Sequence, residues 1–278
     1  MSGDRSTPER FYDEYGAAEW DRLDESIDGR LEFEFTVAEL AETLPERGRV
    51  LDAGGGAGRY AVWLAERGYE VDLVDVSRGQ LDVAERKLAE YGVDDRVSCH
   101  RGSIDDLAFA ADAFDATLCL GGPLSHLTAT GDRERAAREL ARVTRSGGPV
   151  FVSVMGLLGF VQLQALAGRN VRALPALLEH GDYDADLLDE YGYDNEFTAT
   201  HFFRREELQA LLADGGLDVS RITGLEGLGS PLHDAHVRDP VEALDDPERE
   251  AIVCAFDRLR DDPAVADLSV HMLAVCRA

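Results

Sequence analysis

The sequence predicts an α/β protein in which helices cover both faces of a mostly parallel β-sheet. Apolar, β-rich runs recur along the chain and alternate with segments of helical spacing, which is typical of parallel strands joined by crossover helices. The chain has 278 residues, of which 45% are hydrophobic, and this is enough to bury one large core. We therefore expect a single domain over residues 1–278.

Seven strands are expected, each rich in apolar or β-branched residues. In chain order they are Arg49–Ala53, Glu70–Asp75, Arg96–His100, Ala113–Leu120, Pro149–Met155, Leu217–Thr223 and Ser269–Cys276. Between the fifth and sixth strands, residues 156–201 interrupt the alternation. We expect them to form a substrate-binding insertion, because long segments of this kind usually build a cap or a pocket wall.

Local signals place helices between these strands. Ser77 and Gln80 form a capping box at the start of a helix that closes near Gly92. Asp132 is expected to cap a helix over Arg133–Arg145, whose five arginines are interpreted as surface residues. Further helices are expected at Glu206–Ala213 and Pro247–Arg260.

The chain is strongly acidic, with 55 Asp and Glu residues against 28 Lys and Arg, a formal charge of −27 and a pI near 4.5. No DNA partner is expected, because nucleic-acid binding requires a basic surface. A salt-rich cytosol, as in a halophilic archaeon, would screen the repulsion between so many like charges. An ordinary acidic bacterial protein is the alternative interpretation.

Cysteine usage and the N-terminal sequence favour a cytoplasmic location. The four cysteines are scattered singly and are interpreted as small core residues in a reducing compartment: Cys99, Cys119, Cys254 and Cys276. The first residues show neither the basic nor the apolar region of a secretion signal. The most apolar stretch, Val150–Val161, is shorter than the ~20 residues of a membrane span, so no span is expected.

The most informative segment is VLDAGGGAGRY, at residues 50–60. The first strand reaches Asp52, and three glycines follow at alternate positions: Gly54, Gly56 and Gly58. Glycines in a strand-to-helix turn let the backbone approach a ligand closely. A dinucleotide-binding fingerprint would need glycine where this chain has Arg59, so NAD is disfavoured. No lysine follows the glycines, as a phosphate-binding Walker loop would require.

With an acid two places before the first glycine, this run resembles motif I, DxGxGxG, of the class I S-adenosylmethionine-dependent methyltransferases. The resemblance extends to Asp75, which ends the second strand where the family has an acid that accepts hydrogen bonds from both ribose hydroxyls. The run from Gly102 to Asp105 aligns with the family's adenine-binding stretch, with Ser103 in place of the usual acid. Turns around the fourth and fifth strands also match, so the likeness covers about residues 49–154.

The resemblance implies S-adenosyl-L-methionine as the cofactor and S-adenosyl-L-homocysteine as the product. It also implies a Rossmann-like seven-stranded sheet of order 3-2-1-4-5-7-6, with strand seven antiparallel. The implied cofactor contacts are Asp52, Ala53, Gly54, Gly56, Gly58, Asp75, Val76, Ser103, Ile104 and Leu120. Local explanations stay open: the glycines could form only a tight turn, Asp75 could be a helix-start acid, and Ser103 could be a turn hydroxyl near a solvated Asp105.

The N-terminal run Phe11–Tyr15, with Trp20, resembles the lid helix of many small-molecule methyltransferases. Residues 1–45 are therefore expected to form a lid followed by a helix, with Tyr15 contacting the substrate. In the alternative, a plain docking helix, Tyr12, Tyr15 and Trp20 would be core residues.

Two further features bear on the substrate. His201 is expected to line the substrate pocket, although His201, Phe202 and Phe203 could simply anchor the insertion. The acids between Asp182 and Glu196 are interpreted as a solvated surface or as a lid that prefers a cationic substrate.

Methyl transfer from a sulfonium requires neither a metal nor a covalent enzyme intermediate, and no metal site is expected. Positioning and desolvation supply most of the rate. An acceptor that must lose a proton also needs a general base. His126 is the candidate, because it lies just past the fourth strand, where the family's substrate and methyl group meet. Alternatively, it packs on the first turn of a helix.

Together these observations predict a methyltransferase that acts on a small-molecule acceptor. The rival hypotheses are a tRNA or protein methyltransferase of the same fold and a non-catalytic S-adenosylmethionine-binding protein. A nicotinamide dehydrogenase is less favoured. A homodimer is an open possibility.

Overall fold

The computed structural model describes residues 7–194 and 197–278, and its centre is a seven-stranded sheet of order β3-β2-β1-β4-β5-β9-β8. The strands are β1 (Arg49–Ala53), β2 (Glu70–Asp75), β3 (Val97–Arg101), β4 (Ala116–Cys119), β5 (Pro149–Met155), β8 (Asp218–Gly224) and β9 (His271–Arg277). The first five pair in parallel, and β9 runs antiparallel to both β5 and β8. The expected α/β class, strand order and antiparallel seventh strand are confirmed.

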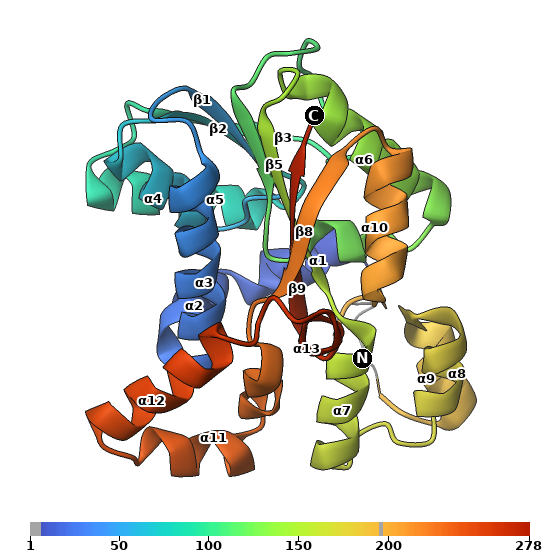
Figure 1. Cartoon of the computed structure of the whole chain (residues 1–278). Coiled ribbons are helices and arrows are strands. Elements are labelled where there is room, and N and C mark those ends of the chain that lie inside the picture. Colours follow the sequence, from blue (N-terminus) through green and yellow to red (C-terminus); the bar gives the residue numbers. More distant parts are fainter. Residues whose placement is uncertain (1–6, 195–196) are drawn as a thin grey trace.

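Helices cover both faces of this sheet (Figure 1). The helices that connect or flank the strands are α3 (Ile27–Thr43), α4 (Arg59–Glu66), α5 (Arg78–Tyr91), α6 (Thr130–Val143) and α10 (Arg205–Asp214). Side chains alternate along each strand, so neighbouring residues join different cores. Val50 packs in the core on the side of α3 and α4, whereas Leu51 packs in the core on the side of α6 and α10.

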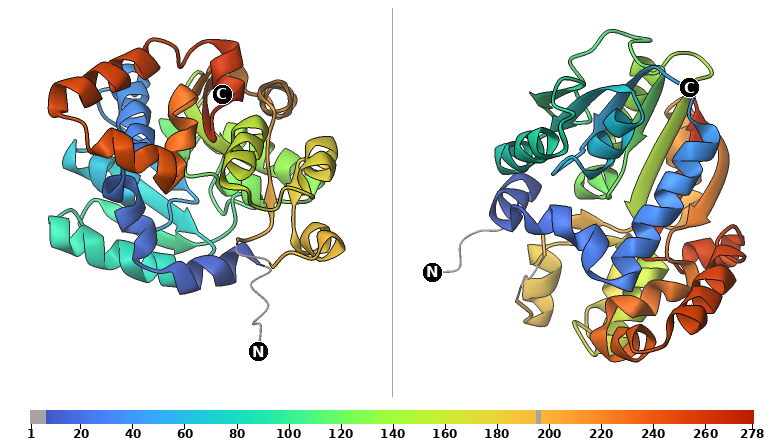
Figure 2. Two further views of the ribbon diagram at one scale, coloured as in Figure 1. Left: turned by 90° about the horizontal axis from the view of Figure 1, so that it is seen from below. Right: turned by 90° about the vertical axis from the view of Figure 1, so that its left-hand side faces the viewer.

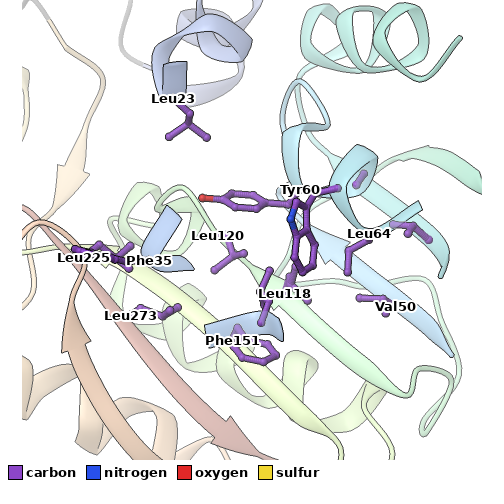
Figure 3. Close-up of a cluster of buried hydrophobic side chains, with 14 of the residues drawn as sticks. Leu23, Phe35, Val50, Tyr60, Leu64, Leu118, Leu120, Phe151, Leu225 and Leu273 are labelled. Carbon is purple, nitrogen blue, oxygen red and sulfur yellow. The ribbon is translucent and has the colours of Figure 1, made fainter. Parts of the chain in front are cut away.

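The core beside α3 and α4 is the one that reaches the candidate site. Tyr60 and Leu64 of α4 pack there with Phe151 of β5 and Leu273 of β9 (Figure 3). Leu120, just after β4, belongs to the same cluster. This packing fixes the ends of the central strands against the helices that surround the site.

Three N-terminal helices precede β1: α1 (Pro8–Tyr15), α2 (Ala18–Glu25) and α3. α1 docks on the start of α5 through hydrogen bonds from its C-terminal half. The Asp13 carboxylate accepts from the Gly79 amide (2.8 Å) and the Ser77 hydroxyl (2.5 Å), while the Gln80 side chain donates to the carbonyl of Tyr12 (2.8 Å). The first helix is therefore held over the carboxyl end of β2.

Two long insertions extend the sheet at its carboxyl end. Residues 156–201 hold α7 (Leu157–Ala167), α8 (Leu174–His180), β6 (Asp182–Tyr183), α9 (Ala185–Tyr191) and β7 (Thr200–His201), and β6 pairs with β7 in a small separate sheet. Between β8 and β9 lie η2 (Gly227–His233), α11 (Ala235–Glu242), α12 (Asp246–Asp257) and α13 (Pro263–Asp267). Figure 2 shows α8 and α9 apart from α11 and α12, whereas α7 of the first insertion packs against η2 and α13 of the second. The sequence indicated only the α12 part of the second one.

Several local expectations were wrong. Strand β4 is shorter than Ala113–Leu120, and Phe114 forms only an isolated bridge to Thr144. Helix α6 begins at Thr130, so Asp132 lies inside its first turn and pairs with Arg135 instead of capping.

Two predicted side-chain environments also differ. Arg133 is buried rather than on the surface, because its guanidinium donates to the carbonyls of Leu127 and Thr128. Cys254 is exposed and is not a core residue, unlike Cys119 and Cys276. Over the part of the chain that the structure describes, no helix combines the length and the apolar character of a bilayer span.

The helix α5 has half of its expected capping box. The Ser77 hydroxyl accepts from the Gln80 amide at 3.0 Å. The Gln80 side chain, however, does not return to the Ser77 amide; it bonds to the carbonyls of Tyr12 and Gly16 instead. The Gln80 side chain, which would complete the capping box, therefore docks α1 instead.

Candidate active site

A cavity of about 340 Å³ opens at the carboxyl ends of β1–β4, beneath α1 and α2. This volume lies in the range of small-molecule sites. The turns after the strands contribute Gly54, Gly55, Gly56, Ala57, Asp75, Val76, Gly102, Ser103, Ile104, Leu120, Gly121, Pro123, His126 and Leu127. The N-terminal segment contributes Thr7, Pro8, Glu9, Tyr12, Glu19, Arg22 and Leu23, and α4 and α5 add Arg59, Tyr60 and Gln80. The site is thus made by elements from the first half of the chain.

The backbone of the glycine turn lets a ligand approach closely, because side chains are excluded from it. Gly54 has a φ of +75°, which L side chains rarely adopt, and a Cβ there would lie 2.4 Å from the ring of Pro123. Gly56 also has a positive φ, +51°, and its amide donates to Asp75 Oδ2 at 2.9 Å. Because β1 and β2 are neighbours in the sheet, the turn after β1 and the carboxylate that ends β2 meet at one edge of the cavity.

Asp75 has hydrogen-bonding capacity left over for a ligand. Its Oδ1 accepts from the Ser77 amide at 2.8 Å, and its Oδ2 accepts from Gly56. Each carboxylate oxygen has a further lone pair. Burial raises the pKa of Asp75 to about 6, and these two amide hydrogen bonds oppose the rise. An ionised Asp75 can therefore accept two hydroxyl hydrogen bonds from one ligand.

Asp52 lies beneath the glycine turn and does not line the cavity. It is fully buried, and its carboxylate oxygens have no hydrogen-bond partner among the described residues. A Cβ on Gly55 would sit 2.6 Å from its Oδ2. Burial, and then the charge of Asp75, raises the pKa of Asp52 to about 7. Ala53 and Gly58 are likewise absent from the lining.

The loop after β3 brings Ser103 and Ile104 to the cavity wall. The Ser103 hydroxyl is committed to Asp105, whose other oxygen pairs with Arg135 at 2.9 Å. Asp105 is therefore a paired acid and not a free solvated one. What Ser103 and Ile104 offer a ligand is backbone and apolar surface.

His126 comes from the short 3₁₀ helix η1 (Pro123–His126) after β4. Its Nδ1 lies 3.3 Å from the carbonyl of Ala199, and its Nε2 lies 2.9 Å from the Tyr12 hydroxyl. The carbonyl can only accept, so Nδ1 carries the proton and Nε2 accepts from Tyr12. Burial lowers the pKa of His126 to about 4, which keeps the imidazole neutral near pH 7.

Two predicted substrate contacts lie elsewhere. Tyr15, at the C-terminal end of α1, is 38% exposed and is not among the residues that line the cavity. His201 is buried in β7, where its two nitrogens pair with Asp182 and Glu207, both at 2.7 Å. His201 is thus placed as an anchor of the insertion, as are the buried Phe202 and Phe203.

Sequence reasoning missed several lining residues, chiefly the charged ones. Glu19 and Arg22 of α2 form an ion pair of 3.4 Å at the cavity wall. Their i, i+3 spacing was a visible signal, since both fall on one helix face. Trp20, on another face of α2, packs in a core cluster instead.

The comparisons with known proteins place the chain among methyltransferases. Residues 50–148 match a family described as a methyltransferase domain. The ubiquinone/menaquinone biosynthesis C-methyltransferase UbiE of Pectobacterium carotovorum is 30% identical over 191 residues, which are 66% of this chain and 72% of that protein. Methyltransferase GfsG of Streptomyces halstedii is 35% identical over 150 residues, 52% of each chain, so the chain spans about half the length of this relative.

The comparison with solved structures shows the fold. A crystal structure of an S-adenosylmethionine-dependent methyltransferase from Clostridium acetobutylicum covers 96% of this chain and 98% of its own, with a TM-score of 0.59 at 14% identity. The fold and the site define a class I methyltransferase. The chain belongs to the S-adenosylmethionine-dependent methyltransferase family.

The residues present fit the family's cofactor. A glycine turn that excludes side chains and the Asp75 carboxylate, which has acceptor capacity left, meet at one end of the cavity, and the buried Asp52 lies beneath the turn. Together they can receive a ligand with a vicinal diol and a positively charged amino-acid part.

Proposed function

We propose that this protein transfers a methyl group from S-adenosylmethionine to a small-molecule acceptor. The observation that carries the proposal is the meeting of the Gly54–Gly56 turn with the partly unsatisfied Asp75 carboxylate inside one cavity. Asp75 would accept the ribose hydroxyls, and the glycine turn would face the amino-acid part of the cofactor. Val76, Ile104 and Leu120 would provide apolar contacts to the nucleoside.

The bound cofactor supplies a sulfonium-activated methyl group, and the chain's own residues orient the reactants and exclude water. α1 and α2 cover the cavity, and Leu23, Tyr60 and Leu120 line it. The same three side chains belong to one apolar cluster (Figure 3). A dry and fixed environment favours loss of the sulfonium charge in the transition state. Asp52 would act through the turn above it, since it does not touch the cavity itself.

His126 is the proposed general base for an acceptor that loses a proton. Its Nε2 is an unprotonated acceptor at the cavity wall, held in that tautomer by the Ala199 carbonyl. An acceptor hydroxyl or acidic C–H group would take the place of the Tyr12 hydroxyl on Nε2. A neutral imidazole in this position can accept a proton as the methyl group is transferred.

The acceptor is proposed to be small and largely apolar. The cavity is walled mainly by apolar groups, and the UbiE relative is named for quinone biosynthesis. The insertion at residues 156–201 would complete the acceptor end, because Phe197 stacks edge-on against Phe11 of the lid at 5.2 Å and lies 5.9 Å from the His126 ring. The N-terminal helices would act as the lid.

The first test is calorimetry with S-adenosylhomocysteine. The unaltered chain should bind it, and Asp75→Asn should bind at least tenfold more weakly. Asp82→Asn is the matched control, since Asp82 is an exposed acid on α5 paired with Arg78. No binding by the unaltered chain, or equal binding by both variants, would overturn the cofactor assignment.

The second test is turnover with an acceptor panel that contains phenols, quinols, C–H acids, amines and deacylated tRNA. Methylation of a phenol, quinol or C–H acid supports the proposal. Methylation of tRNA alone would establish the nucleic-acid alternative. Binding of S-adenosylhomocysteine without turnover of any acceptor would favour a non-catalytic binding protein.

A further inference from the structure

A second cluster of functional groups lies outside the cavity, where the second insertion meets the sheet. Glu226 follows β8, His233 ends η2, and His271 begins β9. One ligand atom from each lies within 4.8 Å of the other two. Glu226 and His271 are buried, whereas the His233 side chain is 19% exposed and gives the cluster a route to solvent.

Both imidazoles converge on a single carboxylate oxygen. His271 Nδ1 lies 2.5 Å and His233 Nε2 lies 3.5 Å from Glu226 Oε1. His233 Nε2 is buried and has no hydrogen-bond partner among the described residues. An imidazole nitrogen without a hydrogen bond thus faces a buried carboxylate, next to a second histidine.

The surroundings hold these groups in ligand orientation. Glu226 Oε2 accepts from the Ser269 hydroxyl and the His271 amide, both at 2.9 Å, so Oε1 is the oxygen left to face the histidines. His233 Nδ1 lies 3.2 Å from Asp28 Oδ2, and this contact places the imidazole proton on Nδ1 and the lone pair on Nε2. Metal-binding histidines characteristically have such a carboxylate on their second nitrogen.

We propose that Glu226, His233 and His271 bind a divalent transition-metal ion of the Zn²⁺ class. Two imidazoles and one carboxylate are a common donor set for Zn²⁺. Metal–ligand bonds of about 2.0–2.2 Å in a tetrahedron put the ligand atoms roughly 3.4 Å apart. The His233–Glu226 distance already meets this value, and the His271–Glu226 pair opens when the ion replaces the proton between them.

The site is connected to the cavity by a chain of contacts. Glu32 Oε2 lies 3.7 Å from His271 Nδ1 and accepts from Arg22 at 2.5 Å, and Arg22 lines the cavity. A fourth ligand position is open to Glu32 or to water. An ion here would fix the second insertion to α3 and, through Glu32, the orientation of Arg22.

The test is titration of the chelator-treated full chain with Zn²⁺ by calorimetry, and with Co²⁺ by its visible absorption. We expect one ion per chain. Glu226→Gln and His233→Ala should weaken binding at least tenfold. Asp28→Asn should weaken it ten- to a hundredfold, the usual effect of losing the partner of a metal-bound histidine. The matched control is His236→Ala, because His236 is 97% exposed and pairs only with Asp234.

Absence of Zn²⁺ and Co²⁺ binding, or equal affinities of His233→Ala and His236→Ala, would overturn the proposal and leave a hydrogen-bonded ion-pair network. Glu226→Gln keeps the shape of the side chain and guards against a folding defect, which its melting temperature checks. Binding of S-adenosylhomocysteine is measured on the same samples. The metal site and the methyltransferase assignment can therefore fail independently.

Discussion

The Tyr12 hydroxyl donates a 2.9 Å hydrogen bond to Nε2 of His126 and so joins the first helix to the loop after β4. The two residues are 114 positions apart in the sequence. Their rings also meet edge to face, with centroids 5.4 Å apart. The candidate base is therefore covered by helix α1.

Loss of this hydrogen bond should loosen the lid. A single hydrogen bond contributes about 1 kcal/mol, so Tyr12→Phe should weaken S-adenosylhomocysteine binding by roughly fivefold and speed its dissociation. Stopped-flow displacement measures both. Tyr15→Phe is the control, because Tyr15 lies on the same helix outside the cavity lining. Equal effects of the two variants would contradict the assigned role of Tyr12.

Removal of the base should affect turnover more than binding. His126→Ala should lower kcat by roughly 10²–10⁴-fold, the usual contribution of a general base. S-adenosylhomocysteine affinity should fall no further than in Tyr12→Phe. Single-turnover kinetics with a proton-bearing acceptor separates the two quantities. An unchanged kcat would remove His126 from the mechanism.

Asp52 should make stability depend on pH in an unusual direction. Its pKa is raised from 3.8 to about 7 in the folded chain, so the folded state binds the proton more tightly than the unfolded state. Between about pH 4 and 7 this group therefore lowers stability as pH rises, by up to about 4 kcal/mol.

Asp52→Asn should accordingly be more stable than the unaltered chain at pH 8 and close to it at pH 5, as measured by urea unfolding. We expect the same variant to bind S-adenosylhomocysteine more weakly, because a strained group at a functional site trades stability for function. If the free energy of unfolding of the two chains changed with pH in the same way, the pKa of Asp52 would not be raised in the folded state.

The glycine turn should tolerate no side chain. Gly54→Ala combines a positive φ with a clash against the Pro123 ring, so it should cost several kcal/mol and abolish cofactor binding. Gly68→Ala is the control: its φ is +90°, but nothing lies within 4 Å of the added Cβ. It should cost only about 1–2 kcal/mol of backbone strain. Thermal unfolding and calorimetry compare the two.

The acidic surface should make folding depend on salt. With a formal charge of −27, we expect stability to rise steeply with KCl, since the Debye length falls to roughly 3 Å at 1 M. Urea unfolding at several KCl concentrations measures this. Full cooperativity and unchanged stability in dilute buffer would argue against the proposed salt-rich cytosol.

The strands β1, β2 and β5 could be predicted well because each is a short, almost fully buried run of residues. The bounds of β1, β2 and β5 agree with the expectations residue for residue, and β3 is shifted by one. β4 was overextended because the apolar residues before Ala116 pack in the core without pairing as a strand. Periodicity reports burial, and it does not report which backbone groups form a ladder.

Tertiary contacts account for what could not be predicted. The motif around Gly54 and Asp75 is local to two adjacent strands, so the sequence shows it. The pairing of Tyr12 with His126, or of His233 with Glu226 and His271, depends on loops that meet only after folding. Nothing in the sequence around Arg133 indicates that its guanidinium binds the carbonyls of Leu127 and Thr128, which follow η1.

The attachment of α1 to α5 has a kinetic consequence. Asp13 and the Tyr12 carbonyl are bound to Ser77, Gly79 and Gln80, a few positions along from the carboxylate proposed to grip the sugar. Because α1 lies over the cavity, we expect a ligand to exchange with solvent faster when the first helix detaches from these partners. We therefore expect release of the nucleoside product, rather than methyl transfer, to limit kcat.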